Sequence, residues 1–164
     1  LHDMLPLVEH FGPHGVMAEN VPYPDIPPNK PRVVVEPDVI RRVIEACDCS
    51  LLLDIAHARL TAENLGRDVH AYIEQLPLER LRELHVTGVG INREGLREDH
   101  LPMTDDDWAL FEWALENIRS GRWARPAVIA CEYGGVGPLF DWRSDPDVIA
   151  HDIPRMVALV RAAQ

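Results

Sequence analysis

Long apolar runs are absent from this chain, and so is any segment that resembles a secretion signal. No apolar stretch approaches the ~20 residues that a helix needs to cross a bilayer, so we expect no membrane span. The N-terminus shows no charged segment followed by an apolar stretch and a cleavage site, so we expect no signal peptide. The first residue is Leu1 rather than Met. We therefore expect a chain that is processed or belongs to a longer polypeptide.

Cysteine and basic residues are also scarce. Cys47, Cys49 and Cys131 give an odd count and no disulfide framework. Cys47 and Cys49 lack a second pair, which makes a thiol metal site a weak interpretation, and reduced thiols in a cytoplasm are expected instead. The chain has 16 Lys and Arg against 27 Asp and Glu, a formal net charge of −11. Without a basic stripe, this balance argues against nucleic acid as the main partner.

The remaining composition is that of one globular domain. The chain has 164 residues, of which 46% are apolar, enough for a single hydrophobic core. Short apolar runs predict strands near 15–21, 50–56, 80–87 and 127–132, and residues at helical spacing predict helices over 37–47, 62–75, 104–118 and from 145–146 towards the C-terminus. A βα order repeated four times predicts a parallel sheet.

Four βα units correspond to half of a (β/α)8 barrel, which normally takes ~250 residues. We therefore expect an α/β, TIM-barrel-like fold over residues 1–164, a single partial domain with two open sheet edges. The Pro-rich stretch from Pro22 to Pro31 predicts an ordered loop or lid, and residues 88–103 a polar loop. Thr104 is expected to cap the helix that follows it, and Pro154 to break or kink the last helix.

All four apolar runs end on a side chain of a type that binds metal ions: Glu19, Asp54, His85 and Glu132. Because side chains alternate along a strand, each of these is the last one on the inward face of its strand. Function gathers at the carboxyl ends of parallel strands, so the pattern predicts one polar centre. A lone buried carboxylate there would be costly, and a cation is the usual compensation.

Two further pairs enlarge this set. His57 follows Asp54 by three residues, across a strand end and its turn, and Glu98 and His100 are two apart in a loop where Asp99 separates them. The candidate ligands are then Glu19, Asp54, His57, His85, Glu98, His100 and Glu132. Mixed nitrogen and oxygen ligands suit Fe, Mn or Zn better than Mg or Ca. Seven ligands exceed the need of one ion, so more than one metal is predicted.

Simpler interpretations exist for several of these residues. A histidine at a strand end is often a hydrogen-bonded structural residue, and Asp54 has the position of a cap for the following helix. Glu98 and Asp99 lie among Arg93, Arg97 and other charges, as in a solvated loop.

Five motifs in order carry a resemblance that covers about residues 15–140. They are Glu19-Asn20-Val21, the stretch Leu51 to Ala58, the stretch Glu83 to Gly88, Glu98-Asp99-His100 followed by Leu101-Pro102, and Glu132-Tyr133-Gly134-Gly135. Together they resemble the multinuclear non-haem iron-dependent oxidative enzymes, which belong to the xylose-isomerase-like TIM-barrel superfamily and include the oxygenase of methanobactin biosynthesis. This chain would correspond to the C-terminal part.

The resemblance implies a barrel with two or three iron ions, zinc or manganese being alternatives, that uses dioxygen to modify a peptide or a small molecule. It also implies a companion protein that binds the leader segment of the peptide. Glu19, Asp54, His57, His85, His100 and Glu132 would be metal ligands, with Glu19 a candidate for bridging two ions. The metal centre would need no further catalytic residue and no other bound cofactor.

The chain departs from the family pattern in three ways. Glu98 stands where relatives usually have Asp, so that either Glu98 or Asp99 could be the ligand; His57 stands where relatives often have Asn. Further histidines from the first half of the barrel are absent. Two alternatives therefore stay open: a divalent-metal sugar isomerase-like enzyme, or a non-catalytic half-barrel that associates with itself or with a partner. A zinc endonuclease of the same superfamily is disfavoured by the acidic charge.

Overall fold

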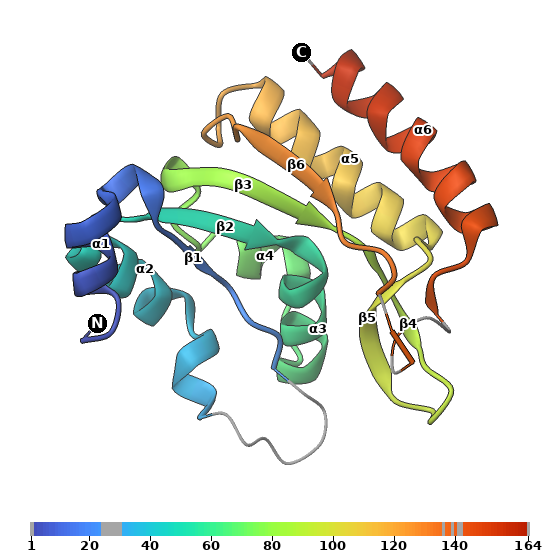
Figure 1. The fold of residues 1–164 in the computed structure, drawn as a ribbon, viewed down its shortest axis with the longest axis horizontal. Coiled ribbons are helices and arrows are strands. Elements are labelled where there is room, and N and C mark those ends of the chain that lie inside the picture. The colour runs from blue at the N-terminus through green and yellow to red at the C-terminus, as the bar shows by residue number, and fades with distance from the viewer. Residues whose placement is uncertain (1, 24–30, 136, 139, 141–142, 164) are drawn as a thin grey trace.

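The computed structural model describes residues 2–23, 31–135, 137–138, 140 and 143–163. Its centre is a four-stranded sheet in the order β1-β2-β3-β6, with every neighbouring pair parallel (Figure 1). The strands are β1 (Met17–Glu19), β2 (Ser50–Asp54), β3 (Leu81–Val86) and β6 (Val128–Cys131). A separate antiparallel hairpin is formed by β4 (Gly88–Ile91) and β5 (Arg97–Leu101).

Helices connect the strands and cover one side of the sheet, while the hairpin lies beyond the carboxyl ends of β2, β3 and β6 (Figure 1). They are α1 (Leu5–Phe11), α2 (Pro37–Cys47), α3 (Ile55–Leu65), α4 (Val69–Ile73), α5 (Asp105–Arg119) and α6 (Pro146–Ala162), with short 3-10 turns η1 (Pro13–Gly15), η2 (Arg32–Val35) and η3 (Leu78–Arg80). None of the described helices has the length and hydropathy of a bilayer span.

The predicted α/β class and the parallel order of four βα units are confirmed. Among the described residues the sheet is open, because β1 and β6 each pair with one strand only. A closed (β/α)8 barrel and a single domain over residues 1–164 therefore stay predictions. The mixed architecture with a parallel four-stranded sheet is what half of such a barrel would contain.

One face of the sheet supplies the core. Leu51, Leu53, Leu84 and Val86 alternate along β2 and β3 and are fully buried, and they belong to one apolar cluster with Phe111 of α5 and residues of α2 to α4. This alternation sends the intervening side chains to the opposite face, because neighbouring residues in a strand point to opposite sides. The candidate ligands of β2 and β3 therefore lie on the face that the helices do not cover.

Several element boundaries differ from the predictions. The strand expected over 50–56 ends at Asp54, whose side chain accepts a hydrogen bond of 2.7 Å from the backbone N of His57 and so begins α3. The single helix expected over 62–75 is wrong. α3 ends at Leu65, before Gly66, which has φ +64°, and α4 follows as a separate helix capped by Asp68.

The polar loop expected over 88–103 is the β4–β5 hairpin, which is a correction to the prediction. Its pairing depends on Gly88, where an added Cβ would lie 2.1 Å from the backbone O of Pro102. Thr104 caps α5 as predicted, in a capping box with Asp107. α6 continues through Pro154 as one helix, so a break there is wrong and a kink stays a prediction. The Pro-rich loop falls largely on residues 24–30, outside the described residues.

Candidate metal centre

Strand register aligns the candidate ligands in layers. Glu19 of β1, Leu52 of β2, Glu83 of β3 and Val128 of β6 are successive partners across the sheet, and Asp54, His85 and Ala130 form the next layer towards the carboxyl ends. Paired residues in neighbouring strands share a face. Glu132 follows β6 directly, and its backbone N donates to the carbonyl of Val86 at 3.0 Å.

A first group of ligand-type atoms comes from all four parallel strands or the residue just after them. Glu19, Asp54, His85 and Glu132 each offer one atom within 4.8 Å of all the others. His85 Nδ1 lies 2.8 Å from Glu132 Oε1, and His85 Nε2 lies 2.9 Å from Glu83 Oε1. Three carboxylates and one imidazole thus converge at the end of the sheet, as the strand endings predict.

A second group joins α3 to the hairpin. His57, Asp99 and His100 also offer atoms within 4.8 Å of one another. The ring of His57 connects the two groups, because its Nε2 lies 2.8 Å from Asp99 Oδ2 and its Nδ1 lies 3.2 Å from Glu19 Oε1. His100 has φ +57°, a conformation that a residue with a Cβ seldom adopts, and its Nδ1 lies 2.6 Å from the carbonyl of Glu132.

Three buried polar atoms in this region have no hydrogen-bond partner within the described structure: Asp54 Oδ2, His85 Nδ1 and Glu98 Oε1. Asp54 is fully buried, and leaving a buried carboxylate oxygen unsatisfied is costly. His85 Nδ1 is close to Glu132 without the geometry of a hydrogen bond. An imidazole nitrogen and carboxylate oxygens left over in one cluster fit a divalent cation, which would satisfy both kinds of lone pair.

The surroundings of Asp54, the most deeply buried acid of the cluster, disfavour its ionised form. Burial raises the pKa of Asp54 to about 6, although the nearby His57 charge opposes this shift. Burial also lowers the pKa of His57, but the hydrogen bond that its ring donates to Asp99 and the charge of Asp54 prevail, and the pKa of His57 is raised to about 9. In Asp99 burial is likewise overcome by the bond to His57, so its pKa is lowered. In the metal-free fold these shifts favour a protonated His57 as the counter-ion of the acids, and a bound cation would take over that role.

Six of the seven predicted ligands fall in the two groups, and Asp99, the alternative to Glu98 in the loop, is the acid grouped with His57 and His100. Glu98 instead accepts a hydrogen bond of 3.0 Å from Asn92 Nδ2, and its Oε1 lies 3.8 Å from Arg143 Nη1. The assignment of Glu98 as a ligand stays a prediction. The positive φ of His100 interrupts the alternation on which the pairing of Glu98 with His100 depends.

Two residues of the site were not predicted as participants. The buried amide of Asn20 donates to the carbonyl of Asp54 at 2.9 Å and accepts from its backbone N at 2.9 Å. Glu83 bonds the ring of His85. The usable signals were an Asn directly after the Glu of β1 and an acid two residues before the His of β3, which places it on the same face.

Because Asn20 fixes the strand end that carries Asp54, Asn20→Ala is expected to weaken metal binding by about 10- to 100-fold, the usual effect of losing an outer hydrogen bond to a ligand. It should also cost about 1–3 kcal/mol of folding stability through the two lost buried bonds. Isothermal titration with Mn²⁺ and urea unfolding would measure the two effects. Asn64→Ala is the matched control, since Asn64 bonds Tyr23 outside the cluster; equal losses in both variants would contradict the role of Asn20.

Histidine and carboxylate groups gathered at the carboxyl ends of parallel strands are the arrangement of metal-dependent α/β enzymes. The family itself is given by comparison of the sequence with known families. The chain belongs to the family described as RiPP precursor modification enzyme MbnB/TglH/ChrH, whose model matches residues 14–125. The resemblance inferred from the five motifs is thereby confirmed.

Several similar proteins are called UPF0276 proteins. A UPF0276 protein of Pseudomonas aeruginosa is 37% identical over 121 residues, which cover 73% of this chain and 41% of that protein. A UPF0276 protein of Acaryochloris marina is 27% identical over 153 residues, covering 92% of this chain and 48% of the relative. This chain thus spans less than half the length of these relatives.

Proposed function

We propose that this chain is the metal-binding half of an iron-dependent oxidative enzyme that modifies a ribosomally made peptide. The observation that carries the proposal is the pair of ligand groups joined by His57, with unsatisfied atoms on Asp54 and His85. Membership of a family of peptide-modifying enzymes supports a peptide as substrate. A leader-binding companion protein is part of the proposal.

Glu19, Asp54, His85 and Glu132 would hold one ion, and His57, Asp99 and His100 a second. Iron bound there would supply the means to bind and activate dioxygen. The chain positions these groups by backbone contacts: Asn20 fixes Asp54, and the carbonyl of Glu132 holds the ring of His100. Imidazole and carboxylate ligands suit iron, with zinc and manganese as competitors.

The test is metal content followed by dioxygen consumption. The chain is purified without oxygen, incubated with Fe²⁺, and analysed by elemental analysis; we expect about two ions per chain, one for each ligand group. An oxygen electrode then follows consumption after addition of a cysteine-containing precursor peptide. Failure to retain iron, zinc or manganese would overturn the proposal at its first step. Retention of metal with no dioxygen uptake, but with isomerisation of an aldose, would favour the isomerase alternative.

A second candidate is a non-catalytic half-barrel, and the observation in its favour is that this chain matches less than half of the length of its relatives. The matched part is 41% to 48% of the relatives, so any ligand that they carry elsewhere is missing here. A chain that binds metal tightly, yet consumes dioxygen neither alone nor with its peptide, would fit this candidate.

A further inference from the structure

Three surfaces of the parallel sheet, its two edges and its inner face, expose apolar groups in the described part of the chain. Parallel strands normally occur with both faces buried, but along β6 the burial runs from exposed at Val128 to half-buried at Cys131. Val128 is 47% exposed and Met17 of β1 is 37% exposed. Both belong to the two edge strands, and Val128 shares the inward face with Glu83 and Leu52. Edge strands and the inner face thus present apolar groups to solvent.

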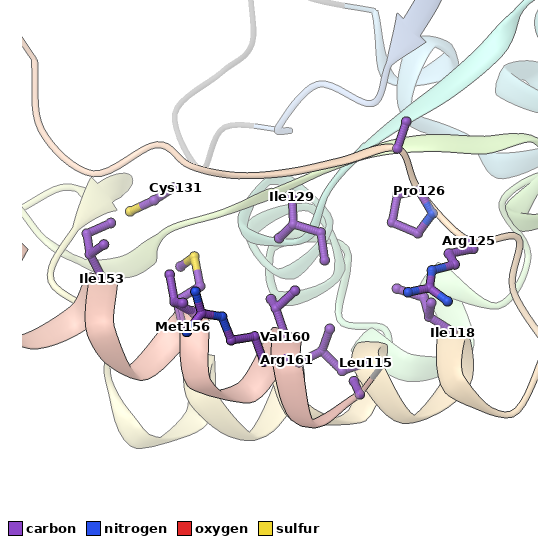
Figure 2. A pocket seen from close by; sticks show the side chains of 13 residues that line it. Leu115, Ile118, Arg125, Pro126, Ile129, Cys131, Ile153, Met156, Val160 and Arg161 are labelled. Atoms are coloured by element: carbon purple, nitrogen blue, oxygen red, sulfur yellow. The ribbon is translucent and has the colours of Figure 1, made fainter.

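An apolar groove adjoins the β6 edge. It lies between β6 and α6, has a volume of about 450 Å³, and is lined by Leu115, Ile129, Met156 and Val160 among others. Figure 2 shows these side chains facing the space between strand and helices, with Arg125 beside Pro126 at the end where β6 begins and Arg161 beside Val160 in the middle of the groove. Cys131 borders the opposite end (Figure 2). α6 therefore does not fill the space beside β6, and the described residues leave this groove open.

Exposed apolar side chains also lie next to the β1 edge, on helix α1. α1 lies immediately before β1 in the chain and contains no buried residue. Its Leu5, Leu7 and Phe11 are 43%, 48% and 61% exposed. A short helix with large exposed apolar side chains is typical of a segment that packs against something else.

We propose that two copies of this chain associate through these surfaces, with β6 of each copy pairing in parallel with β1 of the other. Four strands from each copy would then close one eight-stranded barrel around a two-fold axis along its centre. Both ligand clusters would lie at the same mouth, because all strands run in the same direction. The groove beside β6 would receive α1 of the second copy.

Charge and length favour a second copy as the occupant. In parallel pairing both strands begin at the same end, which brings Arg125 of one copy towards Asp3 of the other, and α1 in the groove would bring its Glu9 towards Arg161. None of these four side chains forms an ion pair within the described part of its own chain. Because the chain matches 41% to 48% of its relatives' length, two copies would supply about one whole barrel.

The test is the mass of the metal-free 164-residue chain in solution, so its outcome does not depend on the proposed function. Light scattering after size exclusion should give twice the 18.5 kDa of one chain. Val128→Asp should shift the mass to that of one chain and weaken association by at least about 100-fold, because a charge would be buried without a partner. Val33→Asp is the matched control, since Val33 is 52% exposed on η2, outside the sheet, and it should stay dimeric.

Alkylation of Cys131 provides a second measurement. Cys47 and Cys49 are buried and Cys131 at the groove is half-buried, so Cys131 is the most accessible of the three thiols, and it should be modified more slowly in the parent than in Val128→Asp. Circular dichroism verifies that both variants are folded. A parent chain that is monomeric at tens of micromolar would overturn the proposal. Masses that grow beyond two copies, or a dimer indifferent to Val128→Asp, would overturn it equally.

Discussion

Asp107→Ala is expected to destabilise the chain by about 3–5 kcal/mol, the usual effect of removing one partner of a buried ion pair. Asp107 is 2% exposed, and it forms a close ion pair with Arg59 of α3, whose side chain is 12% exposed. Its other oxygen accepts from the backbone N and the hydroxyl of Thr104 at 2.8 and 2.6 Å, and from Val89 N at 3.3 Å. One carboxylate therefore joins α3, the start of α5 and the hairpin.

Asp106→Ala is the matched control for this prediction. Asp106 is the preceding residue and also contacts Arg59, at 3.1 Å, but its side chain is 83% exposed. An exposed pair contributes about 0–1 kcal/mol, so this variant should unfold at nearly the parent denaturant concentration. Urea unfolding measures both. Similar losses in the two variants would mean that the charge of the first turn of α5, and not the buried contact, stabilises the chain.

This buried ion pair also bears on the site. Val89 lies in β4, and its partner strand β5 carries Asp99 and His100. Loss of the contact from Asp107 to Val89 should loosen the hairpin before the sheet unfolds, because local stability depends on local contacts. We therefore expect hydrogen exchange to increase first in the hairpin of Asp107→Ala.

The parallel sheet was predictable because apolar runs of strand length alternate with helical spacing, and this pattern is local. α2 matches its prediction at both ends, since Pro37 suits a first turn and the apolar spacing stops at Cys47. The hairpin was not predictable in the same way. Its segments, Gly88–Ile91 and Arg97–Leu101, are polar or rich in glycine. The hairpin is stabilised by the close approach of Gly88 to the backbone of Pro102 and by contacts with Glu63 and Asp107, which are distant in sequence.

The convergence of the candidate ligands was predictable where strands position them and less so where a loop does. Glu19, Asp54, His85 and Glu132 follow from strand endings alone, because parallel strands end at one edge. The choice between Glu98 and Asp99 depends on the positive φ of His100, which no periodicity indicates. The role of Asn20 depends on a pair of hydrogen bonds across 34 positions. Both are tertiary features.

Asp54→Asn is expected to have opposite effects with and without metal, and this is the sharpest test of the candidate centre. The amide keeps the shape of the side chain and still accepts the capping bond from His57 N. It removes a charge that the metal-free fold buries completely, next to Asp99 and Glu132. The metal-free variant should therefore be more stable than the parent at pH 7–8, by about 1–3 kcal/mol.

The pH dependence of this gain follows from the raised pKa of Asp54, about 6 against an ordinary 3.8. Between these values the folded parent binds more protons than the unfolded chain, so its stability falls as pH rises through the window. The advantage of Asp54→Asn should thus be absent near pH 3.8, grow towards pH 6 and stay constant above it. Thermal unfolding in the presence of a chelator measures the difference.

Metal should reverse the order of the two proteins. At a metal concentration of 100 times the dissociation constant, binding stabilises the parent by about 2.7 kcal/mol for each site. Asp54→Asn should lose most of this stabilisation by metal. The amide is a poorer metal ligand than the carboxylate whose buried Oδ2 has no hydrogen-bond partner. Asp68→Asn is the control: Asp68 caps α4 as Asp54 caps α3, but its side chain is 68% exposed and outside the cluster. If Asp54→Asn gained as much stability from Mn²⁺ or Fe²⁺ as Asp68→Asn does, the unsatisfied oxygen of Asp54 would be a folding defect and not a metal ligand.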